Sequence, residues 1–269
     1  MGFELKGSRV LVTGASSGIG AGLAEAFAAA GASVGICARR RDRLAEVAER
    51  ASAAGAPVHT WVTDLADPAQ VDALARDAVE ALGGVDLLVN NAGIPKRRHV
   101  SALDMATVDQ VTRINFLAPV QLTLALLPQM LERGSGRIIN VSSVAATLSS
   151  PGESVYSASK AALAVFSESM TVDLWDRGVR AMVVYPGVVD TELFTLPDND
   201  PFTADIEPIT VDDLVAATLD ALARDALEVY VPAYFKDFAT GKANNIEGFL
   251  AGSAEFVRSQ SGEAPADAP

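Results

Sequence analysis

Short apolar runs alternate with longer segments of helical pattern along most of this 269-residue chain. The runs are almost continuously apolar, which is typical of strands buried on both faces of a parallel sheet. The seven runs predicted to be strands are Arg9–Val12, Ser33–Cys37, Val58–Val62, Val85–Val89, Arg137–Val141, Arg180–Tyr185 and Glu228–Val231. The six helical segments between them are Ala21–Ala30, Leu44–Ala54, Pro68–Leu82, Leu103–Arg133, Tyr156–Arg177 and Val211–Arg224. This alternation predicts an α/β fold, three-layered and doubly wound, around a seven-stranded parallel sheet.

The domain organisation follows from the length of this pattern. Residues 1–260 suit one α/β domain. Residues 193–208 are irregular and too long for an ordinary connection, so we expect a substrate lid there, made apolar by Phe194, Leu196 and Phe202. Residues 236–260 form an amphipathic C-terminal extension that we expect to cover the core or to pair subunits. Residues 261–269 are small, polar and acidic, which is typical of a flexible tail.

Composition narrows the classes of partner. The chain has 34 acidic and 21 basic side chains and a formal net charge of −13. This balance disfavours nucleic acid and anionic membrane surfaces, which both attract positive charge. Cys37 is the single cysteine and there are two histidines, so we expect no disulfide and no metal site. The longest apolar stretch, residues 116–127, is too short to span a bilayer, and no secretory signal is visible, so we expect a cytoplasmic protein.

A glycine-rich turn, Thr13–Gly20, follows the first predicted strand and precedes a helix. Backbone N–H groups and the helix dipole at such a turn favour a phosphate. Glycine also lets the backbone turn sharply, approach a ligand and pack a helix closely on the sheet. The residues predicted to bind a cofactor here are Gly14, Ser16, Ser17, Gly18, Ile19 and Gly20.

The same turn also spells Gly14-x-Ser16-x-Gly18, the pattern of a hydrolase nucleophile elbow. Ser16, Asp64 and His99 occur in the order that such a triad requires. However, hydrolase elbows lie further along the sheet, and neither histidine follows a late strand. The dinucleotide interpretation is therefore favoured over the hydrolase one.

Basic residues follow the second predicted strand. An acid at the end of this strand would hydrogen-bond the ribose 2′-hydroxyl and select NAD(H). This chain has Arg39 and Arg40 there instead, and a guanidinium suits a 2′-phosphate. The sequence therefore favours NADP(H) over NAD(H), with Arg39 as the first candidate and Arg40 as the second.

Tyr156 and Lys160 stand four residues apart near the start of a predicted helix, which places both on one helix face. A neighbouring ammonium group and the positive helix end both favour the phenolate, and we expect them to lower the pKa of Tyr156. A phenol tuned in this way can exchange a proton with a carbonyl or alcohol oxygen. By itself this spacing is more often a surface pair.

Polar residues at the ends of two later strands complete the candidate site. Ser142 and Ser143 end the fifth strand, at the edge where open α/β sheets bind ligands, and either hydroxyl could bind a substrate oxygen. The turn Asn90–Gly93 ends the fourth strand and suits a tight turn under a cofactor. Asn115 lies in a mostly apolar helical run, where a buried amide requires partners.

In combination these motifs resemble those of the short-chain dehydrogenase/reductase family. The matching residues run in family order from residue 8 to about 191. They are Thr13–Gly20, Asp64-Leu65, Asn90-Asn91-Ala92-Gly93, Asn115, Ser143, Tyr156-x-x-x-Lys160 and Pro186-Gly187-x-x-x-Thr191. The resemblance implies a single Rossmann-type domain, and it makes the catalytic interpretation of Tyr156 and Lys160 the favoured one.

The resemblance also implies a role for each matching residue. Tyr156 would be the acid/base, Ser143 would orient the substrate oxygen, Lys160 would hold the nicotinamide ribose, and Asn115 would hold a proton-relaying water. Ser143 is chosen over Ser142 because it lies thirteen residues before Tyr156, the usual interval in the family. The remaining cofactor contacts implied are Asp64 and Leu65 at the adenine, Asn91, Ala92 and Gly93 at the adenosine side, and Pro186, Gly187, Val189 and Thr191 around the nicotinamide.

The chain is therefore expected to be an NADP-dependent oxidoreductase. It would transfer hydride between NADP(H) and an apolar ketone, aldehyde or secondary alcohol, and it would assemble as a homodimer or homotetramer. The alternatives are a non-catalytic NADP-binding sensor or scaffold, and an epimerase or dehydratase of the same fold. The basic run Lys96–His99 could attract an anionic substrate tail, although a solvated loop is the favoured interpretation.

Overall fold

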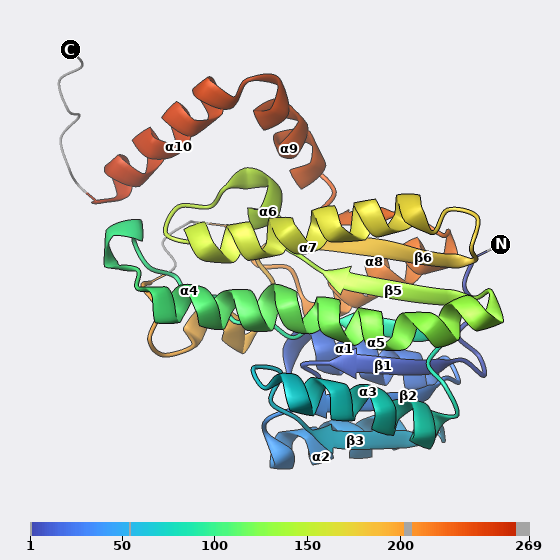
Figure 1. Ribbon diagram of the computed structural model, residues 1–269. Coiled ribbons are helices and arrows are strands. Elements are labelled where there is room, and N and C mark those ends of the chain that lie inside the picture. The colour runs from blue at the N-terminus through green and yellow to red at the C-terminus, as the bar shows by residue number, and fades with distance from the viewer. Residues whose placement is uncertain (1, 54, 202–205, 262–269) are drawn as a thin grey trace.

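The computed structural model describes residues 2–53, 55–201 and 206–261. Within them a single parallel sheet has the strand order β3-β2-β1-β4-β5-β6-β7 (Figure 1). The strands are β1 (Arg9–Thr13), β2 (Ser33–Ala38), β3 (Val58–Val62), β4 (Leu87–Asn90), β5 (Gly136–Val141), β6 (Val179–Pro186) and β7 (Glu228–Val231). The predicted α/β fold and its seven strands are confirmed. The order of the strands reverses between β1 and β4, where doubly wound sheets bind ligands.

Helices cover both faces of the sheet. On one face α1 (Gly18–Ala29) contacts α2 (Arg41–Ser52) and α8 (Val211–Ala223). The helices of the other face are α3 (Pro68–Leu82), α4 (Met105–Thr112), α5 (Ala118–Arg133) and α7 (Ser154–Asp173). β1 shows why both layers form: Val10 and Val12 pack in the first apolar cluster and Leu11 in the second. Alternate side chains of one buried strand thus anchor opposite layers.

The predicted helix over residues 103–133 is interrupted. It consists of α4, one turn of π-helix at Arg113–Leu117, and α5. The stretch Met105–Arg133 is long and apolar enough to cross a membrane by length and composition, unlike the shorter run considered in the sequence. Part of this stretch belongs to the core, since Leu122, Leu126 and Met130 are buried, whereas Met105, Leu117 and Leu124 are exposed.

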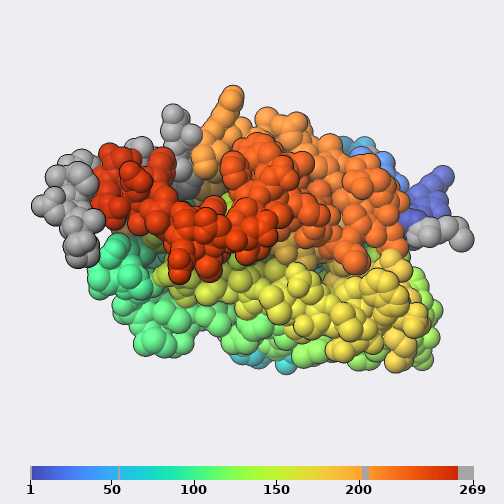
Figure 2. All heavy atoms as spheres, turned by 90° about the horizontal axis from the view of Figure 1, so that it is seen from above, coloured from blue at the N-terminus to red at the C-terminus, as the bar shows by residue number. Residues whose placement is uncertain are grey.

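The chain beyond β7 forms two further helices, α9 (Phe235–Asn244) and α10 (Ile246–Ser261), where the sequence predicted an amphipathic extension. Figure 2 shows them running across the surface of the molecule. Lys242 Nζ fastens α9 to the short helix α6 (Ala145–Leu148) by donating to Thr147 O at 2.8 Å. Helix α6 was not predicted, because four residues are too few for a periodic pattern. The proposed flexible tail lies outside the described residues, apart from the backbone of residue 261.

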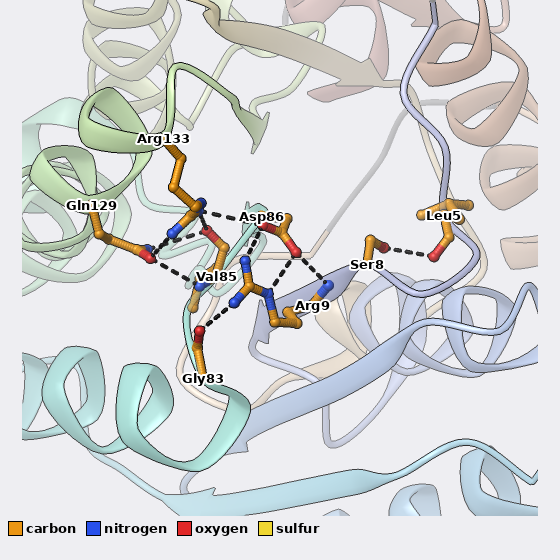
Figure 3. Close-up of polar contacts among 8 residues, drawn as sticks. All are labelled: Leu5, Ser8, Arg9, Gly83, Val85, Asp86, Gln129 and Arg133. Atoms are coloured by element: carbon orange, nitrogen blue, oxygen red, sulfur yellow. Dashed lines mark hydrogen bonds and ion pairs between the residues drawn. The ribbon is translucent and has the colours of Figure 1, made fainter.

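A network of charged side chains lies at the end of the sheet where the strands begin (Figure 3). Arg9 donates from Nε to Asp86 Oδ2 at 2.7 Å and also hydrogen-bonds Gly83 O. Arg133 reaches the same carboxylate at 3.3 Å and donates to Val85 O at 2.7 Å. This network ties β1, α3 and α5 together at the end where the strands begin, leaving the opposite end for the site.

Candidate active site

A cavity of about 620 Å³ opens where the strands end. Its walls come from the β1–α1 turn, from the ends of β2, β4, β5 and β6, from the segment after β6, and from α10. All predicted catalytic and cofactor-binding residues line it except Gly20 and Asn115. Gly20 and Asn115 lie directly behind the wall.

The turn between β1 and α1 has the geometry that its glycines predict. Gly14 has φ +68°, and a Cβ there would come within 2.7 Å of Ala92 Cα. A Cβ at Gly20 would come within 2.4 Å of Asn91 Nδ2 and 2.5 Å of Gly14 O. Because no side chain fits at these positions, α1 packs directly against the turn and its N-terminus faces the cavity.

The turn after β4 is locked onto the first turn by hydrogen bonds. Thr13 Oγ1 accepts from the backbone N–H groups of Asn91, at 3.0 Å, and Ala92, at 3.2 Å. Asn91 Nδ2 donates to Thr13 O at 2.9 Å and to Gly14 O at 3.2 Å. The Asn91 side chain therefore braces the glycine-rich turn, while Gly93 leaves room for Lys160, whose Nζ would lie 3.3 Å from an added Cβ.

The two candidate arginines lie at one end of the cavity and differ in their hydrogen-bond and ion-pair partners. Arg40 is already engaged: it donates to Ser17 Oγ at 2.7 Å and to Ser16 Oγ at 3.1 Å, and it pairs with Glu192. Arg39 is exposed, lines the cavity and makes no side-chain hydrogen bond or ion pair within the described part of the chain. Asp64 also lines this end and accepts a hydrogen bond from Ala66 N at 3.0 Å.

The two adjacent serines after β5 have different roles. Ser142 is buried, and its Oγ donates to Lys160 O at 2.9 Å, so it supports the backbone of α7. Ser143 lines the cavity and hydrogen-bonds the phenol of Tyr156. Ser143, rather than Ser142, therefore lies beside the phenol.

Tyr156 lies in the first turn of α7, one helical turn before Lys160, and both side chains are buried. Lys160 Nζ donates to Val141 O at 2.8 Å and lies 5.8 Å from the centroid of the Tyr156 ring. The hydrogen bond to Val141 holds the ammonium group below the ring and beside the cavity. The predicted pairing of the two side chains on one helix face is present.

The electrostatics of Tyr156 differ from the sequence-based expectation. Burial raises the pKa of Tyr156, and the negative charge of Glu153 raises it further. The hydrogen bond from Ser143 and the charge of Arg97 oppose this increase, but burial outweighs them. Burial also lowers the pKa of Lys160 from 10.5 to about 8. The expected decrease in the pKa of Tyr156 is therefore wrong for the protein without cofactor, because desolvation penalises both charged forms.

Asn115 lies in the π-helical turn and is fully buried. Its Oδ1 accepts from Ile94 N at 2.9 Å and its Nδ2 donates to Ile94 O at 3.0 Å and to Ser159 Oγ at 3.2 Å. π-Helical turns occur frequently at functional sites. Here the turn delivers a polar amide to the back of the cavity, where its partners are satisfied as its burial required.

The segment after β6 forms the remaining wall. Gly187 N donates to Val231 O at 2.8 Å, and a Cβ at Gly187 would come within 2.5 Å of the Phe235 ring. A Cβ at Gly18 would come within 3.0 Å of Thr191 Cγ2, so the glycine-rich turn and Thr191 approach closely across the cavity. Pro186 and Val189 also line this wall.

The predicted solvated loop at Lys96–His99 is wrong for Arg97, which is only 4% exposed and lines the cavity. Lys96 and Arg98 both pair with Asp198 of the segment 193–201. Sequence reasoning also missed Glu153, Glu192, Phe256 and Val257 as cavity residues. None belongs to a motif, and the latter two reach the site only because α10 folds back. Phe202 lies outside the described residues.

The hydrolase alternative is not supported. Ser16 Oγ accepts hydrogen bonds from Arg40, and the His99 ring, which is exposed, contacts Ser101 Oγ at 2.8 Å. His99 is not among the described residues that line the cavity, so it does not act as a base for Ser16.

The residues present fit a nicotinamide dinucleotide. One continuous cavity joins the α1 N-terminus and the two arginines to the Ser143, Tyr156 and Lys160 cluster. The glycine turn provides the close approach that a pyrophosphate needs, since Cβ atoms at Gly14 and Gly18 would meet neighbouring atoms at 2.7 Å and 3.0 Å. The arginines at one end of the cavity suit the phosphates of the cofactor, and the residues at the other end suit proton exchange beside the nicotinamide.

Comparison with known proteins agrees with this geometry. The family of short chain dehydrogenases matches residues 8–200. A short chain dehydrogenase of Pseudocercospora fijiensis is 39% identical over 208 residues, covering 77% of this chain and 67% of its own length. A fatty acyl-CoA reductase of Mycobacterium tuberculosis is 40% identical over 193 residues, covering 71% of this chain and 66% of its own length.

Solved structures of similar proteins contain either cofactor. A short-chain dehydrogenase from Sphingobium yanoikuyae in complex with NADPH is 30% identical with a TM-score of 0.80, covering 90% of this chain and 95% of that one. A short chain dehydrogenase/reductase from Burkholderia phymatum in complex with NAD is 25% identical with a TM-score of 0.83, covering 99% of both. The match over residues 8–200, on this fold and around this site, shows that the chain belongs to the short chain dehydrogenase/reductase family of nicotinamide-dependent oxidoreductases.

Proposed function

We propose that this protein reduces an apolar ketone or aldehyde, or oxidises the corresponding alcohol, with NADP(H) as cofactor. One observation carries the proposal: a single cavity connects the free guanidinium end at Arg39 with the buried phenol of Tyr156. Bound cofactor would supply hydride chemistry at its nicotinamide. The residues described above would supply orientation, charge and the proton.

The preference for NADP(H) rests on Arg39 and Arg40. Arg40 is positioned by Ser16 and Ser17, at the glycine turn where a pyrophosphate would bind. Arg39 lines the cavity without a side-chain partner among the described residues, so its five N–H donors are available to a 2′-phosphate. No acid lies between Cys37 and Arg41 to accept a hydrogen bond from a ribose 2′-hydroxyl.

The proton would move through Tyr156. Because burial raises the pKa of Tyr156, the phenol keeps its proton at neutral pH and can give it to a carbonyl oxygen. Ser143 would donate a second hydrogen bond to that oxygen and so orient it. Lys160, held on Val141 O, would present its ammonium group to the cofactor ribose beneath the phenol.

The proposed substrate is apolar because the cavity wall is. Leu148, Leu193, Phe194, Leu196, Ile206 and Phe256 line the end nearest to the lid. An apolar wall excludes water and leaves few polar groups to bind a hydrophilic substrate. The fatty acyl-CoA reductase among the relatives acts on a substrate with an apolar chain, which supports this proposal.

Cofactor titration tests the specificity. We expect NADPH to bind more tightly than NADH, and Arg39→Ala to remove that difference, a loss of about tenfold or more for a charge-assisted contact to phosphate. Arg41→Ala is the matched control, since Arg41 is exposed and does not line the cavity. Equal binding of the two cofactors to the wild-type protein would overturn the proposed specificity.

Turnover of a panel of aldehydes and ketones with NADPH tests the reaction. Tyr156→Phe should lower kcat by about 10²-fold to 10⁴-fold, the usual contribution of a general acid, while cofactor affinity changes little. Tyr234→Phe, at an exposed tyrosine outside the cavity, should leave both unchanged. Turnover at the wild-type rate in Tyr156→Phe would refute the assignment. Binding of NADPH by the wild-type protein without turnover of any ketone or aldehyde would favour the sensor alternative.

Assembly and localisation stay predictions from the sequence. We propose a homodimer or homotetramer in the cytoplasm, which size-exclusion chromatography with light scattering and cell fractionation would test.

A further inference from the structure

Arg97 lines the cavity, and its charge has no role in the mechanism proposed above. Its side chain is 4% exposed, although it lies in a basic run that would ordinarily be solvated. Burial of a guanidinium is costly unless its donors and charge are satisfied. The function of Arg97 can therefore be inferred from the hydrogen bonds that its guanidinium makes and from the donor that is left unpaired.

Two sides of the guanidinium are satisfied by the segment after β6. Nε donates to Asp200 O at 3.0 Å, and Nη2 donates to Phe194 O at 2.9 Å. The group also lies over the Phe194 ring, with Cζ 5.6 Å from its centroid. The backbone N–H of Arg97 donates to Asn199 Oδ1 at 2.7 Å. These contacts fix the orientation of the planar group.

The third side is unsatisfied. Nη1 is buried and has no hydrogen-bond partner within the described part of the chain. Arg97 lines the same cavity as Tyr156 and Ser143, so a ligand bound there lies against the guanidinium. To pair with Nη1, the ligand has to displace the atoms that now shield this nitrogen. A dry, oriented donor of this kind gives strong selectivity for ligands that carry the matching acceptor, because other ligands leave it unpaired.

The surrounding charges support an acceptor on the substrate. The charge of Arg97 acts both on the phenol of Tyr156 and on the carboxyl group of Glu153, so the guanidinium lies near the reacting end of the cavity. Burial raises the pKa of Glu153, and the charge of Arg97 opposes this increase. Lys96 and Arg98 are occupied by Asp198, which leaves Arg97 as the cation of this run that faces the cavity.

We propose that Arg97 is a specificity-determining residue that binds a second carbonyl or carboxylate oxygen of the substrate, so that the preferred substrates are keto esters or keto acids rather than simple ketones. The inference rests on the proposed reductase function and narrows its substrate class. The second oxygen lies a few bonds from the reacting carbonyl, which Tyr156 and Ser143 bind. An ester or thioester carbonyl and a free carboxylate share this acceptor chemistry.

A series of ketones separates these possibilities. The simple ketone is acetophenone. The keto esters are ethyl benzoylformate, ethyl benzoylacetate and ethyl benzoylpropionate, which move the second carbonyl progressively away from the first, and the corresponding sodium salts supply the carboxylates. We expect wild-type kcat/KM for at least one keto ester or keto acid to exceed that for acetophenone about tenfold or more, in line with a hydrogen bond to a charged group.

Three variants test the residue. Arg97→Leu should remove this preference, with a larger loss of kcat/KM on the keto ester or keto acid than on acetophenone, and Arg97→Lys should restore part of it. Arg98→Leu is the matched control: it also loses a contact to the segment 193–201, through Asp198, but Arg98 does not line the cavity. A role limited to holding that segment predicts equal losses on every ketone in Arg97→Leu, and this outcome would overturn the proposal.

Calorimetric binding of ethyl benzoylacetate and acetophenone to the protein makes the test independent of turnover. Tighter binding of the keto ester to wild type than to Arg97→Leu supports the proposal, whereas equal binding of both ligands to both proteins overturns it. Failure of the proposed reductase function would show differently, as an absence of NADPH oxidation with every ketone.

Discussion

Glu192 Oε2 accepts a hydrogen bond from Arg40 Nη1 at 2.8 Å, and the same carboxylate pairs with Arg43. The Arg40 hydrogen bond, followed by that of Arg43, lowers the pKa of Glu192, so the carboxylate is ionised at neutral pH. A negative charge thus lies at the cofactor end of the cavity, beside the arginine that also holds Ser16 and Ser17. In the proposed complex with NADP(H), this charge would compete with a phosphate of the cofactor for Arg40.

Glu192→Gln is therefore expected to tighten NADPH binding about twofold to fivefold, the range of an exposed ion pair, with a smaller effect on NADH. Fluorescence titration with both cofactors at low salt measures this. Glu25→Gln, which breaks the exposed pair with Arg50 away from the cavity, should change neither affinity. An equal gain for NADH would show that Glu192 acts on the shared part of the cofactor and not on the 2′-phosphate.

Glu153→Gln should shift the pH dependence of catalysis. The negative charge of Glu153 raises the pKa of Tyr156, so removing the charge lowers that pKa. For alcohol oxidation, which needs the phenolate, the rising limb of the kcat/KM profile should move to lower pH by up to about one unit. Glu168→Gln is the control, because Glu168 is exposed on the same helix and does not act on Tyr156. Identical pH profiles of kcat/KM for wild type and Glu153→Gln would show that the charge of Glu153 does not affect the ionisation of Tyr156.

Lys160 should make stability depend on pH in the alkaline range. Its pKa falls from 10.5 in the unfolded chain to about 8 in the folded one, because it is desolvated. Between these values the unfolded state binds more protons, so the free energy of unfolding rises with pH, by about 3 kcal/mol in total. The cost of the buried charge is fully present below about pH 8.

Lys160→Met should abolish this rise. At pH 7 the variant should be the more stable protein by about 2 kcal/mol, since it avoids the buried charge but loses the hydrogen bond to Val141 O. Urea unfolding of the cofactor-free proteins from pH 7 to pH 10 measures the difference, in which contributions from other titrating groups cancel. Parallel curves for the two proteins would contradict the burial of a charged Lys160.

Gly20→Ala should destabilise the protein by about 1–3 kcal/mol, because its Cβ would lie 2.4 Å from Asn91 Nδ2 and 2.5 Å from Gly14 O. Moving α1 away to relieve the contact also disturbs the turn, so affinity for either cofactor should fall. Gly252→Ala in α10 is the control: no atom lies within 4 Å of its added Cβ, and a helical alanine should stabilise slightly. Thermal unfolding and cofactor titration provide the measurements.

The fold was predictable because most strands are almost continuously apolar and most helices have clear ends. Asp67 caps α3 by accepting from Ala69 N at 2.9 Å, and Gly83, with φ +73°, ends it. The π-helical turn that contains Asn115 was not predictable. No proline or glycine interrupts the pattern between residues 105 and 117, and the π-turn depends on contacts to Ile94 and Ser159 from elsewhere in the fold.

The parts of the candidate site that sequence motifs encode were predictable. The parts that depend on tertiary contacts were not. Gly14, Ser143, Tyr156 and Lys160 meet because each ends a strand or begins a helix at one edge of the sheet. The burial of Arg97 comes from Phe194 and Asp200, about a hundred residues later in the chain, and no local pattern reports it. The sign of the change in the pKa of Tyr156 was missed because sequence does not reveal desolvation.

The wall that carries Arg97 joins segments that lie 102 residues apart, through Arg97 N and Asn199 Oδ1 and through Lys96 and Asp198. Closing so long a loop costs chain entropy, which is compensated only when the intervening β5, α7 and β6 are already in place. Most of these contacts are polar and do not bury apolar surface, so we expect this wall to open locally at a lower free energy than the sheet beneath it. We therefore expect the proposed selection among substrates to be lost at a lower temperature than the fold of the sheet.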